Sequence, residues 1–234
     1  MSIHPTAIVD SVATVPASCE IGAYCVVDAG VELGENCKLH SHVVLGGPSK
    51  FGSDNEIFSF AVVGGPPQDI TYKGEPTRLE VGDRNVIREY VSISRGTTKG
   101  GGTTRVGCDT LIMAYTHIGH DSVIGDHAML INGATLAGHV TVEEWAVVGA
   151  LCPVHQYVRI GAHAYVGGGT TITQDVLPYS MTSAERDTHA FKVLLASKLN
   201  TSQALEKLRS EGELGEDVEI LVRFIEASQR GVIK

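Results

Sequence analysis

The sequence has little basic charge and no long apolar run, and each shortage excludes a class of protein. Its formal net charge is -9 at pH 7, which disfavours nucleic-acid binding because phosphate neutralisation needs clustered Lys and Arg. No apolar run approaches the length of a membrane span, and the opening stretch MSIHPTAIVD lacks the basic region and apolar core of a secretory signal. We therefore expect a cytoplasmic protein without a membrane span.

Cysteine spacing and aromatic content exclude two further classes. The five cysteines show no C-x-x-C spacing, so they fit neither a disulfide framework nor a structural zinc site. Aromatic residues make up only 6% of the chain against 27 glycines, which indicates a repetitive, turn-rich backbone.

Apolar residues recur at every sixth position over most of the chain. The register holds from Ile3 to Val63, fails at Asp69 and Glu75, and resumes at Val81. A second insertion, SRGTTKGGGTTR, shifts the phase by one residue, after which the register runs unbroken from residue 106 to residue 172. Four positions after the apolar residue, the side chain is usually small.

This period is the hexapeptide signature of a parallel β-helix, in which three hexads form one triangular coil of about 18 residues. The general crossover rule favours a right-handed coil, whereas the resemblance described below implies a left-handed one. Four cysteines occupy the small position, and we predict that they pack inside the column: Cys19, Cys25, Cys37 and Cys152.

A helical pattern replaces the hexads near the C-terminal end. TSQALEKLRS opens with Thr and Ser as possible N-caps, and EDVEILVRFIEASQRG places four apolar residues on one face: Val218, Leu221, Val222 and Ile225. We predict an all-β parallel β-helix over residues 1–183, with insertions near 66–80 and 94–105. A short α-helical domain over residues 184–234 is expected to cap the column.

The segment AYTHIGHDSVIGD holds two histidines and a carboxylate. Residues one coil apart lie above one another at about 4.7–4.9 Å, so His120, His139 and His155 should gather along one edge of successive coils. His117 lies in the same coil as His120. A carboxylate such as Asp121 can fix a histidine tautomer and stabilise its imidazolium, so we predict that His120 is a general base.

Other interpretations of the histidines are surface imidazoles without a role, or a zinc site between coils or subunits, as in a class of carbonic anhydrases with this kind of helix. The spacing differs from the one that those anhydrases require, so we predict no metal. His127, Trp145 and His163 form a second stack, spaced by whole coils, for which a solvated or packed corner is expected.

Seven ordered segments carry a resemblance to a known family: HPTAIV, DNEI, QDITYKGEPTRLEVGDRN, RGTTKGGG, HIGHD, NGATLAGHV and VHQ. They resemble the UDP-N-acetylglucosamine O-acyltransferase (LpxA) family of hexapeptide-repeat acyltransferases, from residue 3 to about residue 179 and again in the terminal SQRGVIK. The resemblance implies a left-handed β-helix and a homotrimer with active sites between subunits, without a cofactor. The implied reaction moves an R-3-hydroxyacyl group from acyl carrier protein to the 3-hydroxyl of UDP-N-acetylglucosamine, the first step of lipid A synthesis.

The resemblance also implies three catalytic roles. His120 matches the general base and Asp121 its companion carboxylate. Gly138 matches a backbone N–H donor to the tetrahedral oxyanion, where the absence of a side chain lets the main chain approach closely.

Substrate-binding roles follow from the same resemblance. Gln68 and Asp69 match residues that hold the sugar, and four others match residues that line the sugar nucleotide site: His117, His139, His155 and Gln156. Gly168 matches a position on the acyl ruler, where a missing side chain leaves the groove long. We therefore expect a longer rather than a shorter hydroxyacyl chain.

Acyl carrier protein is acidic, so its docking needs a local basic patch. Five residues around the second insertion are candidates: Arg84, Arg88, Arg95, Lys99 and Arg105. Ordinary solvated surface charge is the alternative interpretation.

The sequence departs from the family at two places. Thr71 stands where family members carry lysine, with Lys73 two residues further on, and the segment from residue 182 to residue 202 differs throughout, with His189 and Arg186 as candidate substitutes there. A related acyltransferase that uses another UDP-sugar, such as a 3-amino sugar, or another acyl donor in surface glycan synthesis is therefore an alternative. A non-catalytic hexapeptide trimer and a metal-dependent hydratase are less favoured.

Overall fold

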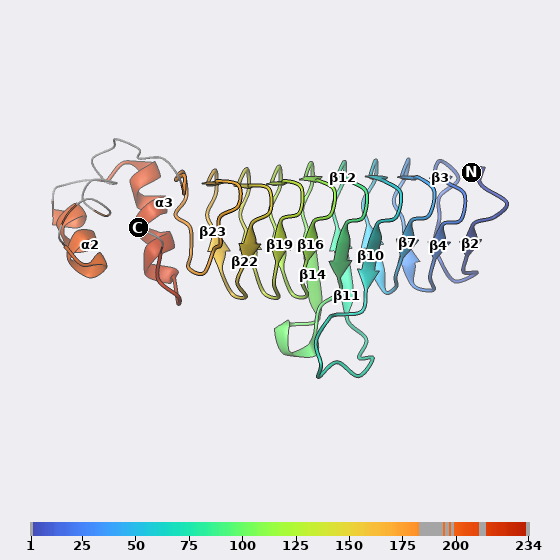
Figure 1. Ribbon diagram of the computed structural model, residues 1–234, viewed down its shortest axis with the longest axis horizontal. Helices are drawn as coiled ribbons and strands as arrows, with labels where there is room; N and C mark the ends of the chain where they lie inside the picture. The colour runs from blue at the N-terminus through green and yellow to red at the C-terminus, as the bar shows by residue number, and fades with distance from the viewer. Residues whose placement is uncertain (1, 183–193, 195–196, 198, 211–213, 233–234) are drawn as a thin grey trace.

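The computed structural model describes residues 2–182, 194, 197, 199–210 and 214–232. Within these residues, the chain winds into a long column of short strands that ends at two helices (Figure 1). The strands form three parallel sheets, and neighbours in each sheet come from successive coils.

Each sheet lines one face of the column. The first sheet contains, in spatial order, β1 (Ser2–Ile3), β3 (Glu20–Ile21), β6 (Lys38–Leu39), β9 (Glu56–Ile57), β12 (Val86–Ile87), β15 (Leu111–Ile112), β18 (Met129–Leu130), β21 (Val147–Val148) and β24 (Tyr165–Val166). The second contains β2 (Ile8–Val9), β4 (Val26–Val27), β7 (Val44–Leu45), β10 (Val62–Gly65), β13 (Ser92–Ser94), β16 (His117–Ile118), β19 (Thr135–Leu136) and β22 (Pro153–Val154). The third contains β5 (Val31–Glu32), β8 (Ser49–Phe51), β11 (Arg78–Val81), β14 (Thr103–Val106), β17 (Val123–Ile124), β20 (Thr141–Val142) and β23 (Arg159–Ile160).

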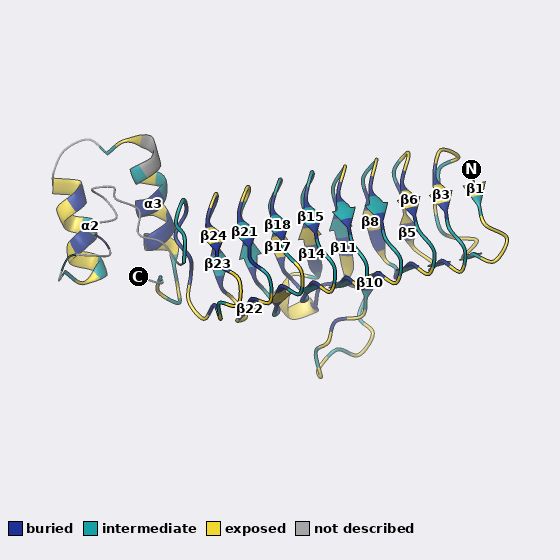
Figure 2. Cartoon of the chain, turned by 45° about the horizontal axis from the view of Figure 1, so that its top comes forward, coloured by how far each residue is buried: buried dark blue, intermediate teal, exposed yellow. Residues whose placement is uncertain are grey.

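The hexad position of the sequence is the inward-facing position of the strands. Ile118 pairs with Leu136 one coil along, and both are fully buried, whereas the alternate residues face outward (Figure 2). The four cysteines predicted at the small position are buried, which confirms that prediction: Cys19, Cys25, Cys37 and Cys152. Burial raises the pKa of the first three thiols.

The column is a left-handed parallel β-helix, as the resemblance implied. The right-handed crossover rule arises from twisted strands that feed a helix before the next parallel strand. Most strands here have two residues and are connected by further short strands, so the cause of the rule is absent.

One edge of the column carries a ladder of aromatic rings. Five residues between the first and second sheets, all with positive φ, stack with ring centroids 4.9 to 5.1 Å apart: Tyr24, His42, Phe60, Tyr90 and Tyr115. A left-handed backbone conformation costs about 1–2 kcal/mol in an ordinary residue, and stacking between coils offsets part of that cost. We call these five residues the aromatic ladder.

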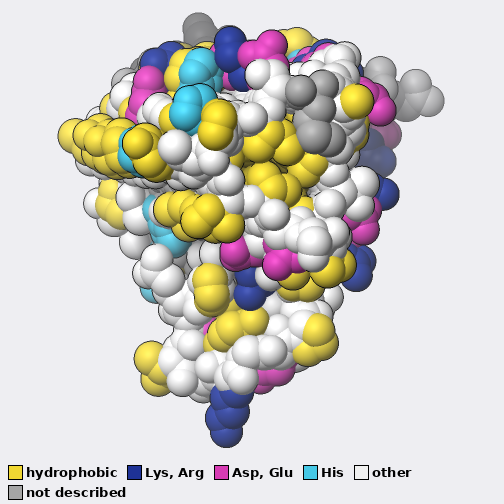
Figure 3. Space-filling view, turned by 90° about the vertical axis from the view of Figure 1, so that its right-hand side faces the viewer, with side chains coloured by type: hydrophobic (Ala, Val, Ile, Leu, Met, Phe, Trp, Pro, Cys, Tyr) yellow, Lys and Arg dark blue, Asp and Glu magenta, His cyan; other side chains and the backbone are white. Residues whose placement is uncertain are grey.

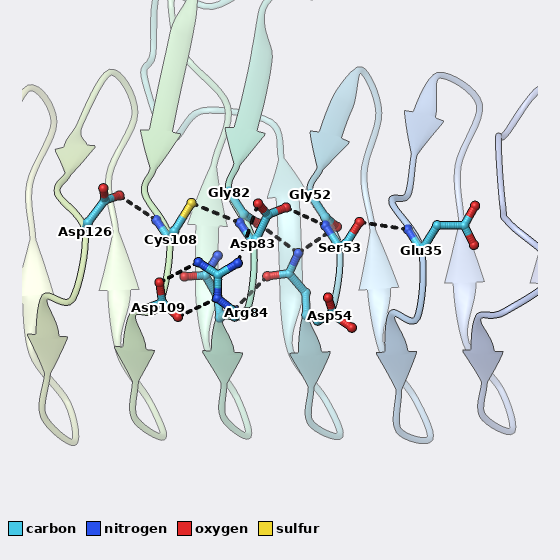
Figure 4. Close-up of polar contacts among 12 residues, drawn as sticks. Glu35, Gly52, Ser53, Asp54, Gly82, Asp83, Arg84, Cys108, Asp109 and Asp126 are labelled. Atoms are coloured by element: carbon cyan, nitrogen blue, oxygen red, sulfur yellow. Dashed lines mark hydrogen bonds and ion pairs between the residues drawn. The ribbon is translucent and has the colours of Figure 1, made fainter.

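A polar network follows the edge between the third and first sheets (Figure 4). The Ser53 N–H donates to Asp83 Oδ1 at 2.7 Å, and the Cys108 N–H donates to Asp126 Oδ1 at 2.7 Å, so each carboxylate joins two coils. Further along this edge lies the second predicted stack, in which Trp145 packs 4.1 Å from His127 and 6.1 Å from His163, measured between ring centroids.

Both insertions leave the column at the third edge, between the second and third sheets. Residues 66–77 connect β10 to β11, and residues 95–102 connect β13 to β14 and contain the short helix η1 (Thr98–Gly100). Figure 1 shows the two loops projecting from the same side of the column.

Two helices close the C-terminal end, α2 (Thr201–Ser210) and α3 (Glu216–Ala227). The capping prediction for α2 was wrong by one residue, because Asn200 Oδ1 accepts from the Gln203 N–H while Gln203 Oε1 accepts from the Asn200 N–H. The predicted face of α3 is confirmed: Leu221, Val222 and Ile225 are buried and Val218 packs against them. The predicted division at residues 183 and 184 lies outside the described residues. In the described part of the chain, no helix has the length and apolar character needed to cross a bilayer.

Candidate active site

His120 and Asp121 form a short pair at the edge that carries both insertions. Strand β16 directs Ile118 inward, and the chain then turns so that His120 Nδ1 lies 2.8 Å from Asp121 Oδ2. The Asp121 side chain is fully buried, whereas that of His120 is 18% exposed. Because an ionised carboxylate only accepts hydrogen bonds, Nδ1 carries the proton and Nε2 is left with a lone pair that can accept one.

The second insertion holds Asp121 in place. Thr97 donates to both carboxylate oxygens, from its backbone N–H to Oδ1 at 2.8 Å and from its hydroxyl to Oδ2 at 2.6 Å, and the Asp121 N–H donates to Thr104 Oγ1 at 2.8 Å. A Cβ on Gly100 would lie 2.1 Å from Asp121 Cγ, so this glycine packs directly on the carboxylate. Sequence reasoning did not identify Thr97, Gly100 and Thr104, and the only available signal was the Gly- and Thr-rich composition of the insertion.

Gly138 and His139 lie one coil beyond the pair. The His139 N–H donates to the His120 carbonyl at 2.8 Å, and the two imidazole rings meet edge to face with centroids 5.1 Å apart. His139 Nε2 lies 3.8 Å from Asp121 Oδ2, and its ring stacks on Tyr157. Burial lowers the pKa of His139, although the Asp121 carboxylate opposes that shift.

The side-chain atoms of His120, Asp121 and His139 that could bind a metal all lie within 4.8 Å of one another. Both oxygens of Asp121 already accept hydrogen bonds from Thr97, and His120 Nδ1 is turned toward the same carboxylate. A metal ion bound through Asp121 Oδ2 or His120 Nδ1 would have to replace these contacts. The arrangement therefore suits proton transfer through His120 Nε2 better than metal binding.

His117 lies on the outer face of β16, in the coil of His120. Its Nδ1 is 2.8 Å from Ser92 Oγ on β13. Burial lowers the pKa of His117, so this imidazole is neutral at neutral pH. A neutral ring can both donate and accept a hydrogen bond, which suits recognition of a substrate hydroxyl or amide.

His155 and Gln156 follow β22, further along the same edge. The Ala137 N–H donates to the Val154 carbonyl, which sets His155 one coil beyond the segment with Gly138. His155 Nδ1 lies 3.1 Å from the Gln156 carbonyl, which also accepts from Arg230 Nη1 at 2.8 Å. Both His155 and Gln156 are exposed.

The remaining predicted residues lie on the first insertion and on another edge. Gln68 is exposed and Asp69 is partly buried, and hydrogen bonds from Thr71 lower the pKa of Asp69, as do the charges of Lys99 and His120. Gly168, in contrast, follows β24 at the edge between the first and second sheets. One chain therefore does not bring Gly168 together with His120.

The predicted basic patch loses Arg95 and otherwise stays a prediction. Arg95 is buried, with its guanidinium donating to the Gly64 carbonyl at 2.7 Å and to Tyr72 Oη at 3.3 Å. Three other arginines form ion pairs with carboxylates, two of which come from a neighbouring coil: Arg84 with Asp109 (Figure 4), Arg88 with Glu89, and Arg105 with Glu80. The candidate substitutes His189 and Arg186 lie outside the described residues.

Comparisons with known proteins place this geometry in a family. The pattern described as "Bacterial transferase hexapeptide (six repeats)" matches residues 13–47 and 103–138, and "Udp N-acetylglucosamine O-acyltransferase; Domain 2" matches residues 185–233. The "Acyl-[acyl-carrier-protein]--UDP-N-acetylglucosamine O-acyltransferase" of Burkholderia thailandensis is 40% identical over 195 residues, which span 72% of this chain and 74% of the relative. That of Alkalilimnicola ehrlichii is 42% identical over 191 residues, with the same coverage of both chains.

Solved structures agree over nearly the full length. LpxA from Acinetobacter baumannii superposes with a TM-score of 0.93 at 36% identity, covering 99% of each chain. The UDP-N-acetylglucosamine O-acyltransferase from Moraxella catarrhalis superposes with a TM-score of 0.93 at 36% identity, covering 100% of each chain. With this identity and coverage, the chain belongs to the UDP-N-acetylglucosamine O-acyltransferase family.

Proposed function

We propose that the protein moves an R-3-hydroxyacyl group from acyl carrier protein to the 3-hydroxyl of UDP-N-acetylglucosamine, the first step of lipid A synthesis. The observation that carries this proposal is the His120 imidazole, whose Nδ1 is engaged by the buried Asp121 carboxylate while Nε2 is left to accept a proton. A sugar hydroxyl is a weak nucleophile at neutral pH, and a positioned base contributes about 10²- to 10⁴-fold in rate.

The residues of this edge supply the proton transfers and the oxyanion donor of the reaction. His120 Nε2 takes the proton of the 3-hydroxyl while the sugar oxygen attacks the thioester carbonyl and a C–O bond forms. The N–H of Gly138, which donates to no backbone carbonyl in the described part of the chain, stabilises the oxyanion. Collapse of the tetrahedral intermediate breaks the C–S bond, and the departing carrier thiolate receives the proton from His120 to become a thiol. Asp121 stabilises the imidazolium between these two steps.

The acceptor is held, in this proposal, by residues on both sides of the pair. Asp69 and Gln68 on the first insertion bind the sugar. The sugar nucleotide then extends past His117 and His139 toward His155 and Gln156. This direction follows the order of the coils along the edge.

We further propose that the site is completed in a homotrimer. Gly168, the predicted acyl-ruler position, lies on a different edge from His120, so a neighbouring copy must bring that edge to the base. The aromatic ladder supports this association, because Tyr24 is 58% and Tyr115 65% exposed in the single chain. Figure 3, viewed along the column from its N-terminal end, shows histidines and hydrophobic side chains together along its left side, with further hydrophobic side chains over the end that faces the viewer. Exposed apolar patches of this kind mark association surfaces.

The test of the activity is direct. The purified protein should convert labelled UDP-N-acetylglucosamine and R-3-hydroxyacyl carrier protein to a 3-O-acylated product. A parallel reaction with a UDP 3-amino sugar separates the alternative acceptor, because only that acceptor yields an amide. Absence of turnover with every pair would contradict catalysis, and stoichiometric zinc in the isolated protein would favour a metal-dependent reaction instead.

A further inference from the structure

The two insertions are joined at a point close to the candidate active site. Figures 1 and 2 both show the loops side by side at one edge of the column. Lys99, on η1 of the second insertion, donates from Nζ to Thr71 Oγ1 of the first insertion at 2.8 Å. Thr71 in turn contacts Asp69, with its N–H 2.7 Å and its Oγ1 2.8 Å from Asp69 Oδ1.

The chemistry of Lys99, Thr71 and Asp69 fixes the direction of the hydrogen bonds that join their side chains. A lysine ammonium has three donors and no acceptor, and an ionised carboxylate has only acceptors. The Thr71 hydroxyl must therefore accept from Lys99 and give its own proton to Asp69. Asp69 Oδ1 receives both donors of Thr71, whereas Oδ2 accepts no hydrogen bond from the described residues and can accept one from a ligand hydroxyl or amide.

The Lys99 ammonium also contributes to the charge balance of the site. Asp69 and Asp121 are both carboxylates, and burial disfavours the charged forms of His117 and His139. Arg95 is buried and directed at Gly64 and Tyr72. Hydrogen bonds from Thr71 lower the pKa of Asp69 most, and the charge of Lys99 on the other insertion adds to this shift.

We propose that Lys99 is a positioning residue for the sugar acceptor, acting through the Thr71 hydroxyl to hold Asp69 with Oδ2 directed to the sugar. This inference rests on the proposed function, since it assigns the anchoring of Asp69 within the same site. Neither Lys99 nor Thr71 contacts the reacting atoms, so their loss weakens acceptor binding more than it slows the chemical step.

Steady-state kinetics with UDP-N-acetylglucosamine as the varied substrate and saturating hydroxyacyl carrier protein tests the proposal. Lys99→Met and Thr71→Val should each raise the KM for the sugar nucleotide about tenfold, as expected for loss of a hydrogen bond to a charged group, with kcat within about threefold of the parent. The double variant should do little more than either single variant, because both changes break the same chain of contacts. Lys99→Arg and Thr71→Ser, which keep the donors, should recover most of the affinity.

The matched control is Lys73→Met, which removes an exposed ammonium from the first insertion and should leave KM and kcat at the parent values. A parent-like KM for Lys99→Met, or an equal rise for Lys73→Met, would overturn the proposal. Absence of acyl transfer by the parent would contradict the proposed function without testing the role of Lys99. Calorimetric binding of UDP-N-acetylglucosamine to the parent and to Lys99→Met then decides the inference, which is overturned if the two affinities agree or if neither protein binds.

Discussion

Gly138 packs against the imidazole of His120 so closely that a Cβ at position 138 would lie 2.5 Å from Cε1 and 2.7 Å from Nε2. The glycine thus lies beside the nitrogen that is proposed to accept the proton. Any side chain at position 138 must displace the ring or the backbone of its own coil.

Gly138→Ala is therefore expected to reduce kcat by about 10²-fold, the loss that a misplacement of about 1 Å can cause in a catalytic group. Circular dichroism should remain that of the parent. Gly65→Ala is the control, because its added methyl would meet only Val62 Cγ1, at 3.6 Å. Parent-like turnover by Gly138→Ala would show that the position of the His120 ring does not limit the reaction.

Gly100→Ala should also impair the reaction, because Gly100 packs against Asp121, the partner of His120. The new methyl would lie 2.4 Å from each oxygen of Asp121, so the buried carboxylate must move away from His120 or from Thr97. We expect a fall in kcat of about 10²-fold, together with a lower melting temperature. Thr98→Ala, a change at an exposed residue of the same short helix, controls for disturbance of the loop, and an equal effect of both changes would contradict this role of Gly100.

The six-residue period of the sequence predicted which residues lie inside the column and which lie at an edge. It did not predict side-chain contacts between coils that start in the insertions, where the period is broken. Six-residue spacing was enough to place Ile118 inside the column and His120 at an edge. The contact from Thr97 to Asp121 spans 24 residues and starts in an insertion where the period is broken, so no spacing rule reaches it. Thr71 was noted only as a departure from the family, and its contact with Lys99 becomes visible only when the two insertions are placed together.

The prediction of the basic patch met the same limit. The sequence alone did not show that Arg84 pairs with Asp109, which lies 25 residues further along the chain but on the neighbouring coil. A β-helix turns distant carboxylates into direct neighbours, so linear clusters of basic residues overstate the exposed positive charge.

Stability should fall when the pH is lowered past the ordinary histidine value. Burial lowers the pKa of His117 in the folded state, so below about pH 6.5 the unfolded chain binds more protons than the folded chain. The free energy of unfolding, measured by urea titration, should therefore decrease between pH 7.5 and pH 5.5. His117→Gln should make this decrease smaller, whereas a change at the exposed His4 should not. An unchanged pH dependence in His117→Gln would contradict a lowered pKa of His117 in the folded state.

Gly168 should set the preferred length of the acyl chain. A Cβ added at Gly168 would lie 3.4 Å from its nearest neighbour, the Ala150 oxygen, which is an ordinary contact distance. A longer side chain can therefore project from this edge without distorting the coil. In a competition between hydroxyacyl carrier proteins of different lengths, the parent should prefer the longer chains and Gly168→Met the shorter ones. A parent that selects short chains would refute the prediction, as would a Gly168→Met variant with the preference of the parent.

In the proposed reaction, the His120 imidazole removes the proton from the sugar hydroxyl. The measurement that tests it most directly is turnover of UDP-N-acetylglucosamine by His120→Ala beside the parent, with saturating hydroxyacyl carrier protein. We expect kcat to fall by about 10²- to 10⁴-fold while the KM for the sugar nucleotide stays close to that of the parent. Equal turnover by the two proteins would contradict it.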